Sequence, residues 1–129
     1  MKIIIKLLTL SVLLFTSSAY AEKTIKLEDN SAILGEWKLY AETPQLHLEK
    51  KMVQNEWNFR DNGILTSTAY DPRLDGKKAV DVKYSIEDGV IKKQIQPGRD
   101  KVESCKVIKL EGDDMTLHCK YLYYLLKRK

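Results

Sequence analysis

The stretch ILGEWKLY at residues 33–40 decides the fold that this sequence predicts. Side chains alternate between the two faces of a β-strand, so Gly35, Trp37 and Leu39 share one face. A glycine two residues before a buried tryptophan lets a neighbouring backbone approach closely while the indole fills the space beside it. We therefore expect residues 33–40 to be the first strand of a small antiparallel barrel.

The rest of the chain is interpreted as short strands separated by turns. The tripeptide Asp61-Asn62-Gly63 is typical of a type I′ hairpin turn, because Asn-Gly supplies the positive φ angles that this turn needs. Further strands are expected at residues 52–60, 64–70, 80–87, 90–96, 101–111 and 115–119, with residues 121–129 as an eighth strand or a bent continuation of the seventh. Seven or eight strands joined by hairpins predict an all-β, up-and-down antiparallel barrel, with a two-sheet sandwich as the alternative.

One segment, residues 43–51, has a helical rather than a strand pattern. Thr43 followed by Pro44 matches an N-cap and the first helical position, where the missing N–H of proline costs nothing. Lys50 and Lys51 would complement the negative end of a helix dipole. The sequence therefore predicts one short helix directly after the first strand.

The N-terminus has the three parts of a secretory signal peptide, which we assign to residues 1–21. Two lysines precede an apolar run over residues 3–15, and an Ala-x-Ala motif ends at Ala21. The run is shorter than the roughly 20 residues of a membrane span. We expect cleavage after Ala21, with an uncleaved anchor as the alternative. Because residue 22 is Glu and not Cys, we expect a soluble periplasmic or secreted protein without a lipid anchor or stable membrane span.

The charge of the chain depends partly on this leader. Of the 22 basic and 18 acidic residues, residues 1–21 contain two lysines and no acid, so residues 22–129 carry 20 − 18 = +2. Such a small charge, with lysines interspersed among acids, does not predict a nucleic-acid partner. We expect residues 22–31, which are charged and lack a period, to be a flexible arm, and residues 32–129 to be one barrel domain.

The two cysteines, Cys105 and Cys119, both follow the leader. An even cysteine count in an exported protein favours a disulfide, with buried free thiols as the alternative. A two-residue turn pairs Leu110 with Met115, but that register does not place the two cysteines opposite each other. Since side chains alternate with a period of two, both pairings require a one-residue bulge. We predict that bulge between Cys105 and Ile108.

The chain resembles the lipocalin-like, or calycin, superfamily. The resemblance is carried by Gly35-x-Trp37 near the start, the antiparallel meander and the basic pair Lys127-Arg128 near the end. In that superfamily a Gly-x-Trp on the first strand packs against an Arg or Lys from the last strand and closes one end of the barrel. The resemblance implies this role for Gly35 and Trp37, with Arg128, or else Lys127, as the cation on the indole.

The candidate binding residues are aromatic or polar side chains that we expect inside the barrel. Asn55, Trp57, Phe59 and Tyr84 fall on predicted inward faces, and Tyr123 belongs to the group of tyrosines on the last strand. They are interpreted either as core packing, which fills barrels of about eight strands, or as the lining of a cavity for one small apolar ligand.

Catalytic chemistry is not indicated. His47 falls on the predicted helix, and His118 is out of phase with the inward Leu117 and Cys119, so both histidines are expected to face solvent. Two cysteines lack the partners of a zinc site, and the isolated glycines make no phosphate-binding loop. We expect no enzyme activity, no metal and no cofactor.

Two functions remain open from the sequence. Superfamily members bind retinoids, lipids, haem or other proteins, so the resemblance implies a binding protein. Our first hypothesis is an exported, non-enzymatic carrier of a small hydrophobic ligand. The alternative is a filled barrel that binds another exported protein, as an inhibitor or assembly factor, through the loops at residues 70–78 and 96–101.

Overall fold

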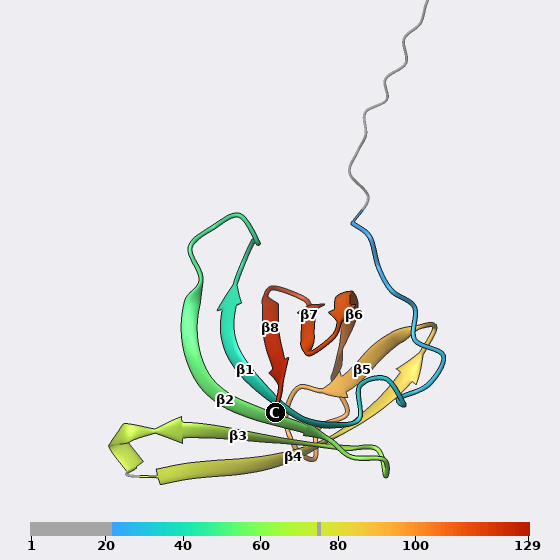
Figure 1. The fold of residues 1–129 in the computed structure, drawn as a ribbon. Coiled ribbons are helices and arrows are strands. Elements are labelled where there is room, and N and C mark those ends of the chain that lie inside the picture. Colours follow the sequence, from blue (N-terminus) through green and yellow to red (C-terminus); the bar gives the residue numbers. More distant parts are fainter. Residues whose placement is uncertain (1–21, 75) are drawn as a thin grey trace, which may run out of the picture.

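The computed structural model describes residues 22–74 and 76–129, and the predicted signal peptide lies outside this range. The strands are β1 (Gly35–Thr43), β2 (Lys51–Phe59), β3 (Ile64–Asp71), β4 (Gly76–Glu87), β5 (Val90–Gln94), β6 (Val102–Glu111), β7 (Asp114–His118) and β8 (Tyr123–Arg128). Each strand pairs antiparallel with the next, and β8 returns to β1, so the sheet closes (Figure 1). The predicted all-β up-and-down barrel is confirmed, with eight strands.

The prediction of a short helix after the first strand is wrong. Thr43 belongs to β1, where it pairs with Tyr123 of β8. Its Oγ1 accepts a hydrogen bond from the Gln45 N–H at 3.3 Å, as an N-cap would, but only one turn follows, closed by Leu48 N–H donating to the Gln45 carbonyl at 3.0 Å. Because β1 and β2 stay paired until Glu42 meets Lys51, both ends of the segment predicted as a helix belong to strands.

Helical structure is scarce in the part of the chain that the structure describes. A short 3-10 helix, η1 (Pro72–Leu74), lies in the β3–β4 connection, where the sequence indicated only a polar turn. No described helix is long and apolar enough to cross a membrane.

The predicted bulge in the last hairpin is confirmed. Leu110 pairs with Met115 and Val107 pairs with Leu117, so Ile108 is an extra residue between the two registers. It lies at the end of the interval in which we expected the bulge. The shift in register brings Cys105 and Cys119 together, and they form a disulfide.

The segment before β1 packs against the barrel, which differs from the flexible arm expected at residues 22–31. Ile25 forms a β-bridge with Val107, and the Leu27 N–H donates to the Gly89 carbonyl at 3.0 Å. Leu27 is buried in the core. Gly89 has φ +82°, and a Cβ there would lie only 2.9 Å from the Lys26 Cβ, so glycine allows the arm to approach this closely. The apolar side chains of the arm explain why it docks.

The barrel wall is not paired along its whole length. β4 pairs with β3 from Gly76 to Lys83, but with β5 only from Tyr84 to Glu87. On the other side, the β2–β3 pairing ends at Asn55 and Ala69. The end of the β3–β4 hairpin, beyond the pair Ala69 and Lys78, therefore projects from the body as a two-stranded ribbon (Figure 1).

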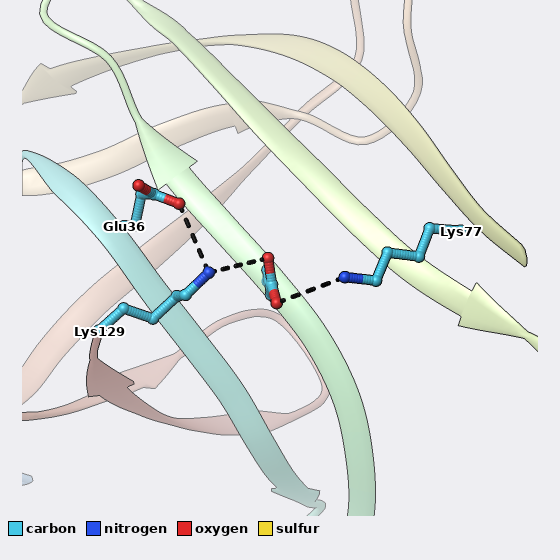
Figure 2. A network of polar contacts seen from close by, with 4 residues as sticks. Glu36, Lys77 and Lys129 are labelled. Atoms are coloured by element: carbon cyan, nitrogen blue, oxygen red, sulfur yellow. Dashed lines mark hydrogen bonds and ion pairs between the residues drawn. The ribbon is translucent and has the colours of Figure 1, made fainter.

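A network of exposed ion pairs links Lys129 to acidic side chains on the outer face of the sheet. The Lys129 Nζ lies 3.2 Å from the Glu56 carboxylate and 3.6 Å from that of Glu36, and Lys77 approaches Glu56 at 3.9 Å (Figure 2). The hydrogen bond and charge of Lys129 lower the pKa of Glu56. Exposed pairs of this kind contribute little to stability, so the network positions the terminus more than it holds the fold.

Candidate functional site

One end of the barrel, called the base here, is closed by Trp37. Its side chain is completely buried, and its indole N–H donates to the Ile33 carbonyl at 2.9 Å. The Arg128 guanidinium carbon lies 4.1 Å from the centre of the indole ring. The same guanidinium donates to the carbonyls of Leu34 (2.9 Å) and Ala32 (3.1 Å). The cation that the resemblance implied is therefore Arg128, and not Lys127.

Gly35 lies next to this cation, and its backbone conformation requires glycine. It has φ +109°, in the region that favours glycine, and a Cβ at this position would lie 3.4 Å from Arg128 Nη1. The Gly-x-Trp pair therefore has a physical role here, since the glycine permits the positive φ angle at the start of β1 and the tryptophan supplies the aromatic face beneath the guanidinium.

Above the base, three of the predicted binding residues form a chain of aromatic contacts. The ring centres of Phe59 and Tyr84 are 5.1 Å apart and those of Trp57 and Phe59 are 6.0 Å apart, both in edge-to-face geometry. The Tyr84 hydroxyl donates to the Arg60 carbonyl at 2.5 Å and accepts from Asn30 Nδ2 at 3.1 Å. Phe59 is thus packed in the core near the base, and Tyr84 is both packed and hydrogen-bonded there.

The middle layer of the interior has a different character. The rings of Trp57 and Tyr124 lie 5.3 Å apart, and Lys93 Nζ is 5.5 Å from the Trp57 ring centre. Lys93 also forms an ion pair with Glu103 at 2.7 Å. These two charged side chains are only 11% and 16% exposed. The interior thus contains a cation, a carboxylate and two aromatic faces in one cluster, which we call the middle-layer cluster.

Several polar atoms in and beside this cluster are not used by the protein. Within the described chain, the Trp57 indole N–H has no hydrogen-bond acceptor, and neither the Tyr124 hydroxyl nor the Asn55 side-chain amide donates to another group. Burial, and then the negative charges of Glu103 and Glu42, raises the pKa of Tyr124 to about 12, so its hydroxyl is neutral at ordinary pH. These groups leave free hydrogen-bonding capacity next to an aromatic surface.

Tyr123 lies apart from the other predicted binding residues. Its ring stacks on His118 at 3.9 Å, and its hydroxyl donates to Glu22 at 2.5 Å. His118 Nδ1 is 2.7 Å from the same carboxylate. Burial alone would raise the pKa of Glu22, but hydrogen bonds from Tyr123 and His118 outweigh it and lower the pKa. Tyr123 thus helps to hold the N-terminal segment against β7 and β8.

The sequence analysis missed Lys93, Glu103 and Tyr124. Their positions follow from the period-two pattern, because Ile91, Cys105 and Leu126 are buried and each lies two residues away on the same strand. Lys93 was counted among the lysines interspersed with acids, and Tyr124 belongs to the group of tyrosines on the last strand, for which no face was chosen. The phase of each strand was therefore the signal that could have found them.

The disulfide lies beside the middle-layer cluster. One oxygen of Glu103 and the two sulfur atoms of Cys105 and Cys119 lie within 4.8 Å of one another. The sulfurs are bonded to each other, so they offer no thiolate to a metal, and this group is not a metal site. The bond itself favours an oxidising compartment.

Comparison with known proteins agrees with the fold. No protein-family model and no curated protein matches this chain. Among solved structures, a lipocalin-like protein from Bacteroides uniformis ATCC 8492 is similar, with a TM-score of 0.64 and 14% sequence identity over 77% of this chain and 100% of that one. At this identity the likeness shows the fold alone. The chain therefore has a lipocalin-like fold.

Proposed function

We propose that this protein is an exported, non-enzymatic binding protein for a small, flat, largely apolar ligand that carries an anionic group. The ligand would pack on Trp57 and Tyr124, with its anionic group directed to Lys93. The lipocalin-like fold supports a binding role, and the observation that carries the proposal is the Lys93–Glu103 pair inside the barrel.

An ion pair in this position is not what barrel stability requires. Two charges that leave water lose hydration, and replacing such a pair by apolar residues of similar volume is often neutral or stabilising. Ligand pockets, by contrast, combine an apolar and aromatic lining with a few placed polar groups. An anionic ligand would accept from Lys93 in exchange for Glu103, while the free N–H of Trp57 and the hydroxyl of Tyr124 would orient it.

Export to the periplasm or beyond belongs to the same proposal. The predicted signal peptide and the Cys105–Cys119 bond both support it, because disulfides persist in oxidising compartments. Processing after Ala21 would make Glu22 the first residue. The mass of the protein recovered from a periplasmic extract checks this; a mass that retains residues 1–21 would contradict it.

The direct test uses 1-anilinonaphthalene-8-sulfonate, a flat aromatic anion of the proposed class. We expect the folded protein to bind it with energy transfer from tryptophan. Trp57→Phe should remove most of this transfer, and Lys93→Met should weaken binding about tenfold, which corresponds to about 1.4 kcal/mol. Trp37→Phe is the matched control and should leave both binding and transfer from Trp57 in place.

Near-UV circular dichroism of each variant separates lost binding from lost fold. Absence of binding to the folded wild type, or equal binding by all three variants, would overturn the proposed site. Native mass spectrometry of protein purified from its own host then identifies the ligand. A co-purifying protein without any small molecule would favour the alternative, a protein-binding barrel.

A further inference from the structure

Residues 76–82 of β4 form a long stretch of unpaired strand edge in the described part of the barrel. On one side this stretch pairs with β3, residue by residue. On its other side, β5 begins to pair only at Tyr84, and among the described residues no strand lies beside it. Figure 1 shows this part of β4 along the outer edge of the β3–β4 hairpin. A free edge of this kind is a template for pairing with another strand.

The end of the β4–β5 ladder is closed by a side chain. The Lys83 N–H donates to Gln94 Oε1 at 2.8 Å, and Gln94 Nε2 donates to the Arg99 carbonyl at 3.0 Å. Gln94 is the last residue of β5, so the chain turns away at this point. A surface hollow of about 510 Å³, lined in part by Lys83, Gln94 and Val102, marks the place where the neighbouring strand ends. The edge beyond Lys83 is therefore open to a partner.

The sequence of this edge is complementary to itself. We propose that residues 76–82 pair antiparallel with the same segment of a second copy of the chain, about a two-fold axis at Ala79. This register places Lys77 opposite Asp81 twice, and opposite charges directly across a strand pair stabilise it. Shifting the axis to Val80 would place Ala79 opposite Asp81 and remove both ion pairs. A two-fold axis of this kind also gives a closed dimer and not a growing fibre.

The charged side chains are available for this contact. Ala79 and Asp81 are exposed, and the Lys77 side chain is 66% exposed. The Thr66 hydroxyl donates to the Asp81 carboxylate at 2.7 Å and so orients it on the outer face. Lys77 reaches Glu56 only at 3.9 Å (Figure 2), so it can turn to a partner at little cost. Edge lysines normally discourage strand association, and here Asp81 of the second copy would neutralise that effect.

The dimer does not rest on the proposed ligand, because residues 77, 79 and 81 face outward, away from the middle-layer cluster. A cysteine at the axis tests the register. In the dimer, Ala79 faces its own copy with Cβ atoms about 4.5–5.5 Å apart, near the reach of a disulfide. We expect Ala79→Cys to form an intermolecular disulfide under mild oxidation, seen on a non-reducing gel. Cys105 and Cys119 are already bonded to each other and do not compete.

Ser85→Cys is the matched control for this cross-link. Ser85 is exposed on the same outer face of the same strand, but there β5 already occupies the edge. We expect little cross-linking of this variant. Equal cross-linking of the two variants, or none by Ala79→Cys, would overturn the proposed register.

A charge exchange tests the ion pairs independently. We expect sedimentation velocity over a range of concentrations to show a reversible dimer, weakened about tenfold or more by Lys77→Asp and likewise by Asp81→Lys. The double variant Lys77→Asp/Asp81→Lys restores the opposite charges and should restore the dimer. Circular dichroism checks that all variants are folded. A wild type that stays monomeric at every concentration, or a folded double variant no tighter than the singles, would contradict the proposal.

Discussion

Trp37 and Trp57 lie directly opposite each other on β1 and β2, yet their surroundings differ. Trp37 has no exposed surface, its N–H is hydrogen-bonded, and its cation, Arg128, is fixed by two backbone carbonyls. Trp57 is 6% exposed, and its cation, Lys93, is held by a carboxylate instead. The comparison teaches that a tryptophan on the inner face closes the barrel where its polar atoms are satisfied. Where its N–H has no acceptor, as at Trp57, we propose that it contacts a ligand.

The difference comes from what each tryptophan meets. The segment before β1 passes over the base and offers the carbonyls of Ile33, Leu34 and Ala32 to Trp37 and Arg128. At the level of Trp57 no such segment is present in the described chain, and the polar groups come from side chains within β5 and β6. Exchanging the partner of a side chain requires less free energy than moving a backbone segment. We therefore expect the side chains of the middle-layer cluster to rearrange more easily than the groups at the base.

The largest expected effect on stability comes from removing the tryptophan that closes the base. Trp37→Ala should cost about 3–5 kcal/mol of unfolding free energy, because it leaves a cavity and removes the platform of Arg128. Trp57→Ala should cost less, since its site is less completely packed. Urea denaturation followed by far-UV circular dichroism measures both. An equal or larger loss for Trp57→Ala would contradict the distinction between the two layers.

An intermediate effect on stability is expected from changes to the ion pair in the middle-layer cluster. Lys93→Met alone leaves the Glu103 carboxylate in the interior without its cation, which should cost about 1–3 kcal/mol. The double variant Lys93→Met/Glu103→Met should recover this loss, or exceed the wild type in stability, because an apolar pair needs no hydration. The same denaturation series supplies the double-mutant cycle. If the double variant were the least stable of the set, the pair would be structural and its assignment to a ligand would lose its main support.

The smallest expected effect is a dependence of stability on alkaline pH. Burial raises the pKa of Tyr124 to about 12, whereas in the unfolded chain a tyrosine titrates near 10. The unfolded state therefore loses the proton first, so this group stabilises the fold below about pH 10 and the contribution is lost as pH rises towards 12. Tyr124→Phe should flatten this decline in the urea midpoint between pH 9 and 11.5.

Tyr123→Phe serves as the comparison on the outer face. Its pKa is also raised to about 12, there by the hydrogen bond to Glu22. This variant should likewise reduce the alkaline decline, but it should also release the N-terminal segment to faster amide exchange at Ile25 and Leu27. Tyr124→Phe should leave that exchange unchanged. Release of the segment by both variants alike would show that the two tyrosines do not act separately.

Much of the fold could be predicted because it depends on neighbours in the sequence. The alternation in residues 33–40 predicted the strand that carries Trp37, and the turn residues separated the other strands. The bulge at Ile108 could be predicted because two pairings in one hairpin were incompatible without it. The helix at residues 43–51 failed for a non-local reason, since pairing of β1 with β2 and β8 extends the strands into a segment with a good N-cap.

The candidate site was predicted less well. Trp57 was predicted because an aromatic residue on the inward face of a strand is easy to recognise. Tyr123 was predicted as a binding residue and Tyr124 was not. Because neighbouring residues of a strand point to opposite faces, this shift by one position chose the outer face instead of the inner one. Lys93 and Glu103 carry charges that normally indicate solvent, so they were not expected inside. The phase of each strand could have shown that both side chains point inward, but only the closed sheet shows that they meet there.

The amino-acid sequence by itself determined the strands, their turns and the Gly-x-Trp base, because alternation and turn chemistry act over a few residues. The tertiary structure decided which charges are buried together, how the N-terminal segment docks and where β4 loses its neighbour. These features depend on the stagger between strands far apart in the chain, and that stagger is set only when the barrel closes.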